Sequence, residues 1–119
     1  MDRLIEEFES VRSLFLEERW PGAEEGLNWG TAALKVKGKT FVRIREPGVL
    51  VIGAEMEEKE ALMRTEPDIY FETDHYKGYP ALLVRLDRID REELRDLLES
   101  RWRAVATPKM IEEFYARSR

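Results

Sequence analysis

Three short segments separated by tight turns constrain the fold of this chain most. Residues 33–37 and 40–45 alternate apolar and charged side chains with the period of two that is typical of a β-strand, and residues 49–53 form a short apolar run. The turns between them, at residues 37–39 and 46–48, each contain a glycine, which permits the positive φ of a tight hairpin. We therefore expect an antiparallel meander at the centre of the fold.

Helical patterns lie on both sides of this meander. Apolar residues recur at helical spacing in residues 2–17, where Asp2 is the expected cap, and a second short helix is expected at residues 55–65. The clearest helix signal begins at Asp90, which forms a capping box with Glu93 ahead of an apolar stripe. These helices provide apolar surfaces that can cover a sheet.

Two more strands and a last helix complete the expected order. Residues 69–73 and 81–86 read as strands, and Thr107 caps a final helix that starts at Pro108. Residues 21–30 are rich in glycine and are expected to form an ordered loop. The order α-β-β-β-α-β-β-α-α predicts an α+β fold, with a five-stranded, mostly antiparallel sheet covered by helices on one face.

Composition limits the class of protein. A length of 119 residues predicts a single domain, residues 1–119, and the absence of cysteine excludes disulfides and thiolate metal sites. The uncharged runs are too short to span a bilayer, and the first residues lack the basic start of a signal peptide, so we expect a cytoplasmic protein that does not bind membranes. A net charge of −5 argues against a surface that attracts nucleic acid everywhere, although it permits a local basic patch.

Four short motifs occur in an order and spacing that resemble the MmcQ/YjbR family of small bacterial proteins. The motifs are Asn28-Trp29-Gly30, then Lys35-Val36-Lys37-Gly38-Lys39-Thr40-Phe41, then Tyr76-Lys77-Gly78-Tyr79-Pro80 leading into Leu83-Val84-Arg85-Leu86, and Ala106-Thr107-Pro108-Lys109. Together they extend over nearly the whole chain.

The resemblance implies a compact α+β fold, described for the family as double-wing and related in shape to type III secretion chaperones and frataxin-like domains. It also implies the family's label of DNA-binding protein. The family has no established catalytic residues to carry over, so we expect a protein that is not an enzyme and has no cofactor. Since this chain is acidic overall, DNA contact would have to come from a local patch.

The segment at residues 35–45 contains the candidate nucleic-acid-binding residues and no acid. The candidates are Lys35, Lys37, Lys39, Phe41, Arg43 and Arg45. Strand alternation predicts that most of the cations share one sheet face with the aromatic ring, which would suit phosphates and a base or sugar. Roughly three to five phosphate contacts would give weak, salt-sensitive DNA binding.

A different interpretation of the same segment is an ordinary solvated strand face. The acids Asp68, Glu72 and Asp74 form a row on another expected strand. If both rows share a face, cross-strand ion pairs would neutralise the cations. The two interpretations therefore differ in the partner of each basic side chain.

His75, the one histidine, follows Glu72 and Asp74 and raises the question of a metal ligand or a general base. No second histidine and no cysteine completes such a set, so we expect a loop histidine with a structural hydrogen bond and no metal site. Five aromatic residues could line a small-molecule pocket or simply anchor core and loops. They are Trp20, Trp29, Tyr70, Tyr76 and Tyr79.

Three functions follow, in order of preference. The first is weak DNA binding through the basic hairpin. The second is a protein–protein interaction module, related in shape to secretion chaperones, that uses the exposed sheet face or an edge strand. The third is binding of a small ligand among the aromatic loops.

Overall fold

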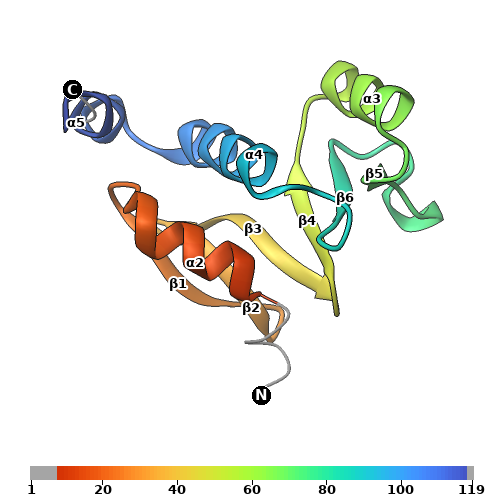
Figure 1. Ribbon diagram of the computed structural model, residues 1–119, viewed down its shortest axis with the longest axis horizontal. Helices are drawn as coiled ribbons and strands as arrows, with labels where there is room; N and C mark the ends of the chain where they lie inside the picture. Colours follow the sequence, from red (N-terminus) through yellow and green to blue (C-terminus); the bar gives the residue numbers. More distant parts are fainter. Residues whose placement is uncertain (1–7, 118–119) are drawn as a thin grey trace.

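The centre of the molecule is a six-stranded sheet, seen in the computed structural model, which describes residues 8–117 (Figure 1). The strands are β1 (Ala23–Asn28), β2 (Thr31–Val36), β3 (Lys39–Glu46), β4 (Val49–Gly53), β5 (Tyr70–Phe71) and β6 (Ala81–Arg85). Their spatial order is β1-β2-β3-β4-β6-β5, and every neighbouring pair is antiparallel. The predicted α+β class and the antiparallel meander are confirmed.

Helices cover one face of this sheet. They are α2 (Glu9–Glu18), α3 (Met56–Thr65), α4 (Arg91–Val105) and α5 (Pro108–Arg117), with a short 3-10 turn η1 (Asp74–Tyr76) before β6. Figure 1 shows α2 and α4 beside one another over the sheet, α5 beyond the end of α4, and α3 beside β5 and β6. Arg91 on α4 donates to Glu17 on α2 at 2.5 Å, so the two covering helices are tied together.

The core lies between the sheet and these helices. Leu34, Val42, Ile52 and Leu82 form one row across β2, β3, β4 and β6, and each is at most 1% exposed. Apolar residues of α2 and α4 complete the cluster, and Trp102 on α4 is fully buried within it. Burying an aliphatic side chain of this size contributes roughly 1.5–3 kcal/mol to stability.

The segment at residues 21–30 differs from its prediction as a loop. It contains strand β1, which pairs with β2 from Ala23 opposite Val36 to Asn28 opposite Thr31. β1 is an edge strand with no regular apolar alternation, because its outer side and much of its surface face solvent. Its pairing, rather than its own side chains, makes it a strand.

The other boundaries lie close to expectation. The side chain of Asp90 accepts from the backbone N–H of Glu93, and that of Thr107 accepts from Met110, so both predicted caps are confirmed. The expected strand at residues 69–73 is shorter, because η1 begins at Asp74. The predicted start of the first helix, including Asp2, lies outside the described residues. Within residues 8–117, no helix combines the length and apolarity needed to cross a membrane.

Candidate nucleic-acid interface

The β2–β3 hairpin presents its basic residues on a rigid turn. Lys37 and Gly38, the two residues between the strands, have φ of 51° and 80°. Two positive φ values identify the type I′ turn, whose twist matches that of a hairpin. Lys37 and Lys39 are therefore held at the tip, where both are exposed.

The five cations of this hairpin have no ion-pair partner among residues 8–117. Arg43 is the most constrained, because it donates to the Tyr76 hydroxyl at 3.1 Å and to the Ile44 carbonyl at 3.3 Å. The acid opposite Lys35 in the register is Glu24 on β1. Neither hydrogen bond of Arg43 involves a carboxylate, so the positive charge of the hairpin is not cancelled by pairing within the described chain.

The acids that were expected to neutralise the hairpin do not reach it. Glu72 forms an ion pair with Lys59 at 3.1 Å. Asp68 and Asp74 are exposed, and neither is in an ion pair with a residue of the described chain. The interpretation in which these three acids neutralise the basic residues by cross-strand pairing is therefore not what the structure shows.

Lys59 is a structural residue that the sequence interpretation missed. Its side chain is fully buried, and its ammonium donates to the carbonyls of Tyr76 at 2.7 Å and Tyr79 at 2.8 Å as well as pairing with Glu72. A lysine ammonium has three donors, and all three are used. A signal was present, since Lys59 lies three residues from Leu62 on the apolar side of α3.

Phe41 is not where strand alternation places it. Leu34 pairs with Val42 but Lys35 pairs with Thr40, so Phe41 is an extra residue in a β-bulge. The bulge breaks the period of two, and the ring is only 5% exposed within the core cluster. It lines a small apolar cavity with Pro80 and Val105 instead of standing beside the cations, so it is not displayed for stacking on a base.

Unlike Phe41, an aromatic residue on the turn between β1 and β2 is exposed to solvent. Trp29 is 87% exposed, whereas Trp20 and Trp102 are buried in the core. The Trp29–Gly30 turn has φ of 55° and 77°, the same two-residue geometry as the basic hairpin. The sequence interpretation considered Trp29 as part of a pocket, because the strand that precedes it was not recognised.

The other candidate side chains serve the loop between β5 and β6. The His75 ring lies edge-on to Tyr76, with ring centroids 4.9 Å apart, and stacks on Tyr79 at 6.3 Å. Tyr70 is buried and donates to Glu93 on α4 at 2.8 Å. The five aromatic residues therefore do not form one pocket. Within residues 8–117, no three acidic, histidine or cysteine side chains converge as a metal site would require.

The protein has an open antiparallel sheet with helices on one face and a charged hairpin beside its edge strand. This arrangement defines a small α+β class of protein. Within that class, a family model described as YjbR matches residues 18–104, and the chain belongs to the YjbR family. The resemblance drawn from the four motifs is confirmed.

Relatives of known sequence and structure agree with this assignment. The chain is 38% identical over 77 residues to uncharacterized proteins of Mycobacterium tuberculosis and Mycobacterium bovis, a match that covers 65% of this chain. The matched region is 53% of those proteins, so the chain spans about half the length of the curated relatives it matches. The crystal structure of Deinococcus radiodurans protein DR2400, with a DUF419 domain, superimposes with a TM-score of 0.67. The superposition covers 87% of this chain and 84% of the Deinococcus chain. At 23% sequence identity, this similarity supports the fold alone.

Proposed function

We propose that this protein binds nucleic acid weakly through the basic β2–β3 hairpin and is not an enzyme. One observation carries the proposal: the hairpin cations have no carboxylate partner among residues 8–117, while Glu72 is held by Lys59. Unpaired cations on a rigid turn are available to phosphate oxygens.

The number of exposed cations in the hairpin sets the expected strength of binding. Lys37, Lys39 and Arg45 are exposed, whereas Lys35 and Arg43 are half-buried. About three phosphate contacts predict a slope of log K against log salt of about −2 for a single strand and about −3 for a duplex. Dissociation constants on the order of 10⁻⁴ to 10⁻⁶ M are typical of such binding without sequence preference.

Charge reversal at the exposed cations tests the proposal. The variant Lys37→Glu/Lys39→Glu/Arg45→Glu leaves Arg43 in place, because Arg43 holds the Tyr76 hydroxyl and its loss would disturb the fold. We expect fluorescence anisotropy with a labelled oligonucleotide to show the salt-dependent binding of the parent protein and its loss in this variant.

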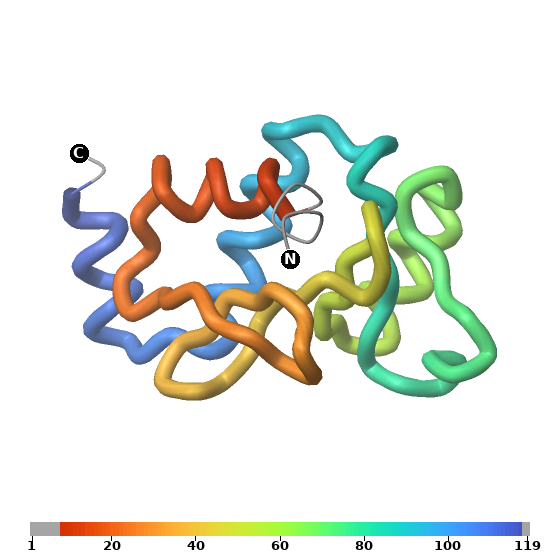
Figure 2. The backbone as a smooth tube through the Cα atoms, turned by 90° about the horizontal axis from the view of Figure 1, so that it is seen from below, coloured from red at the N-terminus to blue at the C-terminus, as the bar shows by residue number. Residues whose placement is uncertain are grey.

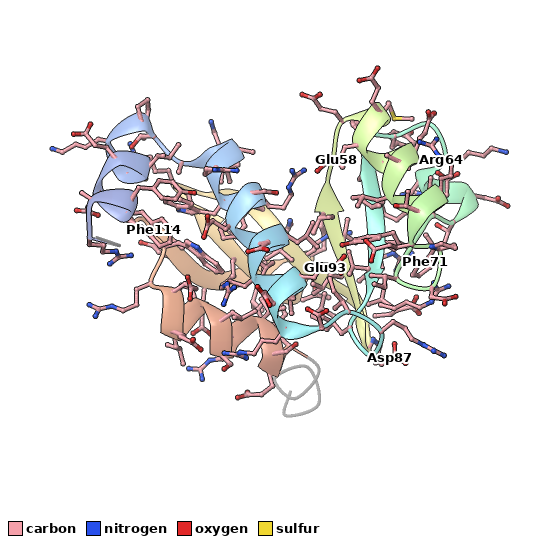
Figure 3. All side chains as sticks on the ribbon, turned by 45° about the horizontal axis from the view of Figure 1, so that its top comes forward. Glu58, Arg64, Phe71, Asp87, Glu93 and Phe114 are labelled. Carbon is pink, nitrogen blue, oxygen red and sulfur yellow. The ribbon has the colours of Figure 1, made fainter. Side chains whose placement is uncertain are left out.

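A matched variant controls for net charge. Arg64→Glu/Arg88→Glu/Lys109→Glu makes the same charge change at exposed positions on α3, on the turn after β6 and on α5. Figure 3 shows Arg64 at the end of the molecule occupied by α3. This variant is expected to keep most of the binding. If the hairpin variant and the parent protein bind the oligonucleotide with equal affinity, the hairpin is not the nucleic-acid-binding site.

A second candidate function, protein interaction by strand addition, rests on the edge of the sheet. The sheet ends at β1, whose outer side has no strand partner in the described chain, and Leu27 on β1 is 65% exposed. An extended segment of another protein could add there as a further strand. A partner recovered by pull-down and lost on Leu27→Glu, with no nucleic-acid binding by the parent protein, would favour this function over the first.

A further inference from the structure

Trp29 occupies a backbone conformation that tryptophan rarely adopts. Its φ of 55° lies in the left-handed region, at the first central position of the type I′ turn that it forms with Gly30. Asparagine, aspartate and glycine are the residues that suit this position, because a large side chain there crowds its own backbone. The chain therefore carries a side chain here that its own turn geometry disfavours.

Packing does not explain the choice of residue. The indole is 87% exposed, and among residues 8–117, apart from the chain neighbours of Gly30, no atom lies within 4 Å of the place where a Cβ on Gly30 would stand. The turn is well fixed nonetheless, since the Thr31 hydroxyl donates to the Asn28 carbonyl at 2.8 Å. A large apolar ring held in solvent on a rigid turn is typical of a contact surface for a ligand.

The Trp29 turn and the basic turn face a common region. Asn28, next to Trp29, donates through its side-chain amide to the Thr40 hydroxyl at 3.1 Å, and Thr40 is next to Lys39. Figure 2 shows the turns at residues 29–30 (orange) and 37–38 (gold) both on the side of the sheet opposite α2. They lie at the two ends of β2, whose six residues span at most roughly 20 Å, and the contact between Asn28 and Thr40 brings Trp29 and Lys39 closer together than an extended strand would.

We infer that the ligand of this surface is single-stranded nucleic acid, with an unpaired base stacked on Trp29 and phosphates held by Lys37 and Lys39. This inference rests on the proposed function and specifies the ligand further. Cations alone attract single strands and duplexes alike, but the flat face of a base is accessible to an indole only where the base is unpaired. A separation of at most roughly 20 Å corresponds to no more than about six nucleotides at roughly 3.4 Å per stacked nucleotide.

The variant Trp29→Asn separates stacking from folding. Asparagine is favoured in the left-handed region, so the variant is expected to melt at or above the temperature of the parent protein. Loss of binding in this variant cannot then be attributed to misfolding. Trp29→Phe retains a ring and is expected to bind with intermediate affinity.

The binding experiment compares a labelled 12-nucleotide oligothymidylate with a 12-base-pair duplex, at low and at moderate salt. We expect Trp29→Asn to weaken single-strand binding by roughly five- to a hundredfold, the range that one base–aromatic stack contributes, and to leave duplex binding unchanged. The salt slope should be preserved, because the phosphate contacts remain.

Tryptophan fluorescence provides an independent measurement. Of the three tryptophans, Trp20 and Trp102 are at most 2% exposed, so Trp29 dominates any change caused by a ligand in solution. Single-stranded oligothymidylate should quench the emission of the parent protein and leave that of Trp29→Asn unchanged.

The outcomes distinguish the two proposals. If the parent protein binds neither oligonucleotide, both fail together. If it binds and the hairpin variant does not, while Trp29→Asn binds the single strand as tightly as the parent protein, the inference about Trp29 is wrong and the proposed function stands. Self-association of the parent protein that Trp29→Asn abolishes, with no quenching by oligonucleotide, would assign the ring to a protein contact and overturn the inference.

Discussion

A single buried lysine organises the longest loop beside the sheet. The Lys59 ammonium connects α3 to the carbonyls of Tyr76 and Tyr79 and to the Glu72 carboxylate. Tyr76 in turn accepts a hydrogen bond from Arg43 on β3, so the loop and the basic strand share a chain of contacts. At the scale of the residue, the position of Arg43 therefore depends partly on a fully buried lysine.

Replacing this lysine tests its structural role. Lys59→Met keeps the length of the side chain but leaves Glu72 and two carbonyls without their donor, and we expect the free energy of unfolding to fall by about 3 kcal/mol. Urea denaturation measures the change. Lys77→Met, at an exposed position in the same loop, is the control and should cost little. A loss of less than about 0.5 kcal/mol in Lys59→Met would contradict the role assigned to the ammonium.

At the scale of the element, two acids join the end of α3 to the start of α4. Glu66 follows α3, and Glu93 lies in the first turn of α4, where it accepts from the Tyr70 hydroxyl. A hydrogen bond between the two carboxyl groups raises the pKa of Glu66 above its usual 4.5, and burial and the charges of Glu93 and Asp90 act in the same direction. Burial, together with the hydrogen bond to Glu93, also raises the pKa of Tyr70. Figure 3 shows Glu93 near the middle of the molecule, between the two groups of helices.

The raised pKa has a direct consequence for stability. The folded protein binds the Glu66 proton more tightly than the unfolded chain, so this group favours the folded state at low pH. Its contribution is lost as pH rises from about 4.5 through the raised pKa. Glu66→Gln, which cannot ionise, should therefore raise the melting temperature near pH 7 and have little effect near pH 4. Melting curves between pH 4 and 7 measure the difference.

Glu60→Gln provides the comparison for this effect. Glu60 is exposed on α3, so replacing it by glutamine removes the same charge but leaves the contact between Glu66 and Glu93 in place. If the two variants show the same dependence of melting temperature on pH, the carboxyl pair does not contribute to stability in the way described.

The elements that could be predicted from the sequence are those whose signal is local. The helix that starts at Asp90 has a capping box and an apolar stripe, and β2 and β3 alternate around a glycine turn, so each was identified from its own residues. β1 lacks such a pattern because an edge strand requires only a neighbour to pair with. Its strand character is a property of the pair and could not be read from residues 21–30 alone.

The same distinction between local and nonlocal signals explains which features of the candidate site could be predicted. The cations of the hairpin were found because charge is visible in a sequence. The burial of Phe41 was not predicted, since the bulge that turns it into the core depends on the register between β2 and β3. The prominence of Trp29 was not predicted either, because it follows from the unrecognised β1. The pairing between strands, which is nonlocal, determines both the burial of Phe41 and the exposure of Trp29.

At the scale of the whole molecule, charge is unevenly distributed. Five of the 20 lysines and arginines lie in residues 35–45, which contain no acid, so the remainder of the chain has 15 against 25 acids, a net charge of −10. A polyanion is therefore attracted by one small region and repelled by the rest of the surface. This arrangement limits the length of strand that can be held.

Oligonucleotide length tests this limit. We expect the affinity for oligothymidylates of 4, 8, 16 and 32 nucleotides to rise up to about eight nucleotides and then level off apart from the statistical gain of more sites, because further phosphates meet an acidic surface. Anisotropy at constant salt measures the series. Affinity that keeps rising steeply to 32 nucleotides would show that binding is not confined to the hairpin and the Trp29 turn.

The buried ammonium of Lys59 also makes the loop between β5 and β6 chemically observable. The chain has no cysteine with which to close that loop covalently, so its order rests on reversible contacts, among them the hydrogen bonds from two of its carbonyls to one amine. Acylating reagents react quickly with solvated lysines such as Lys37 and Lys77, but they reach Lys59 only when the loop opens. The rate at which Lys59 is acylated, followed by mass spectrometry, would thus report how often this part of the molecule opens while the rest stays folded.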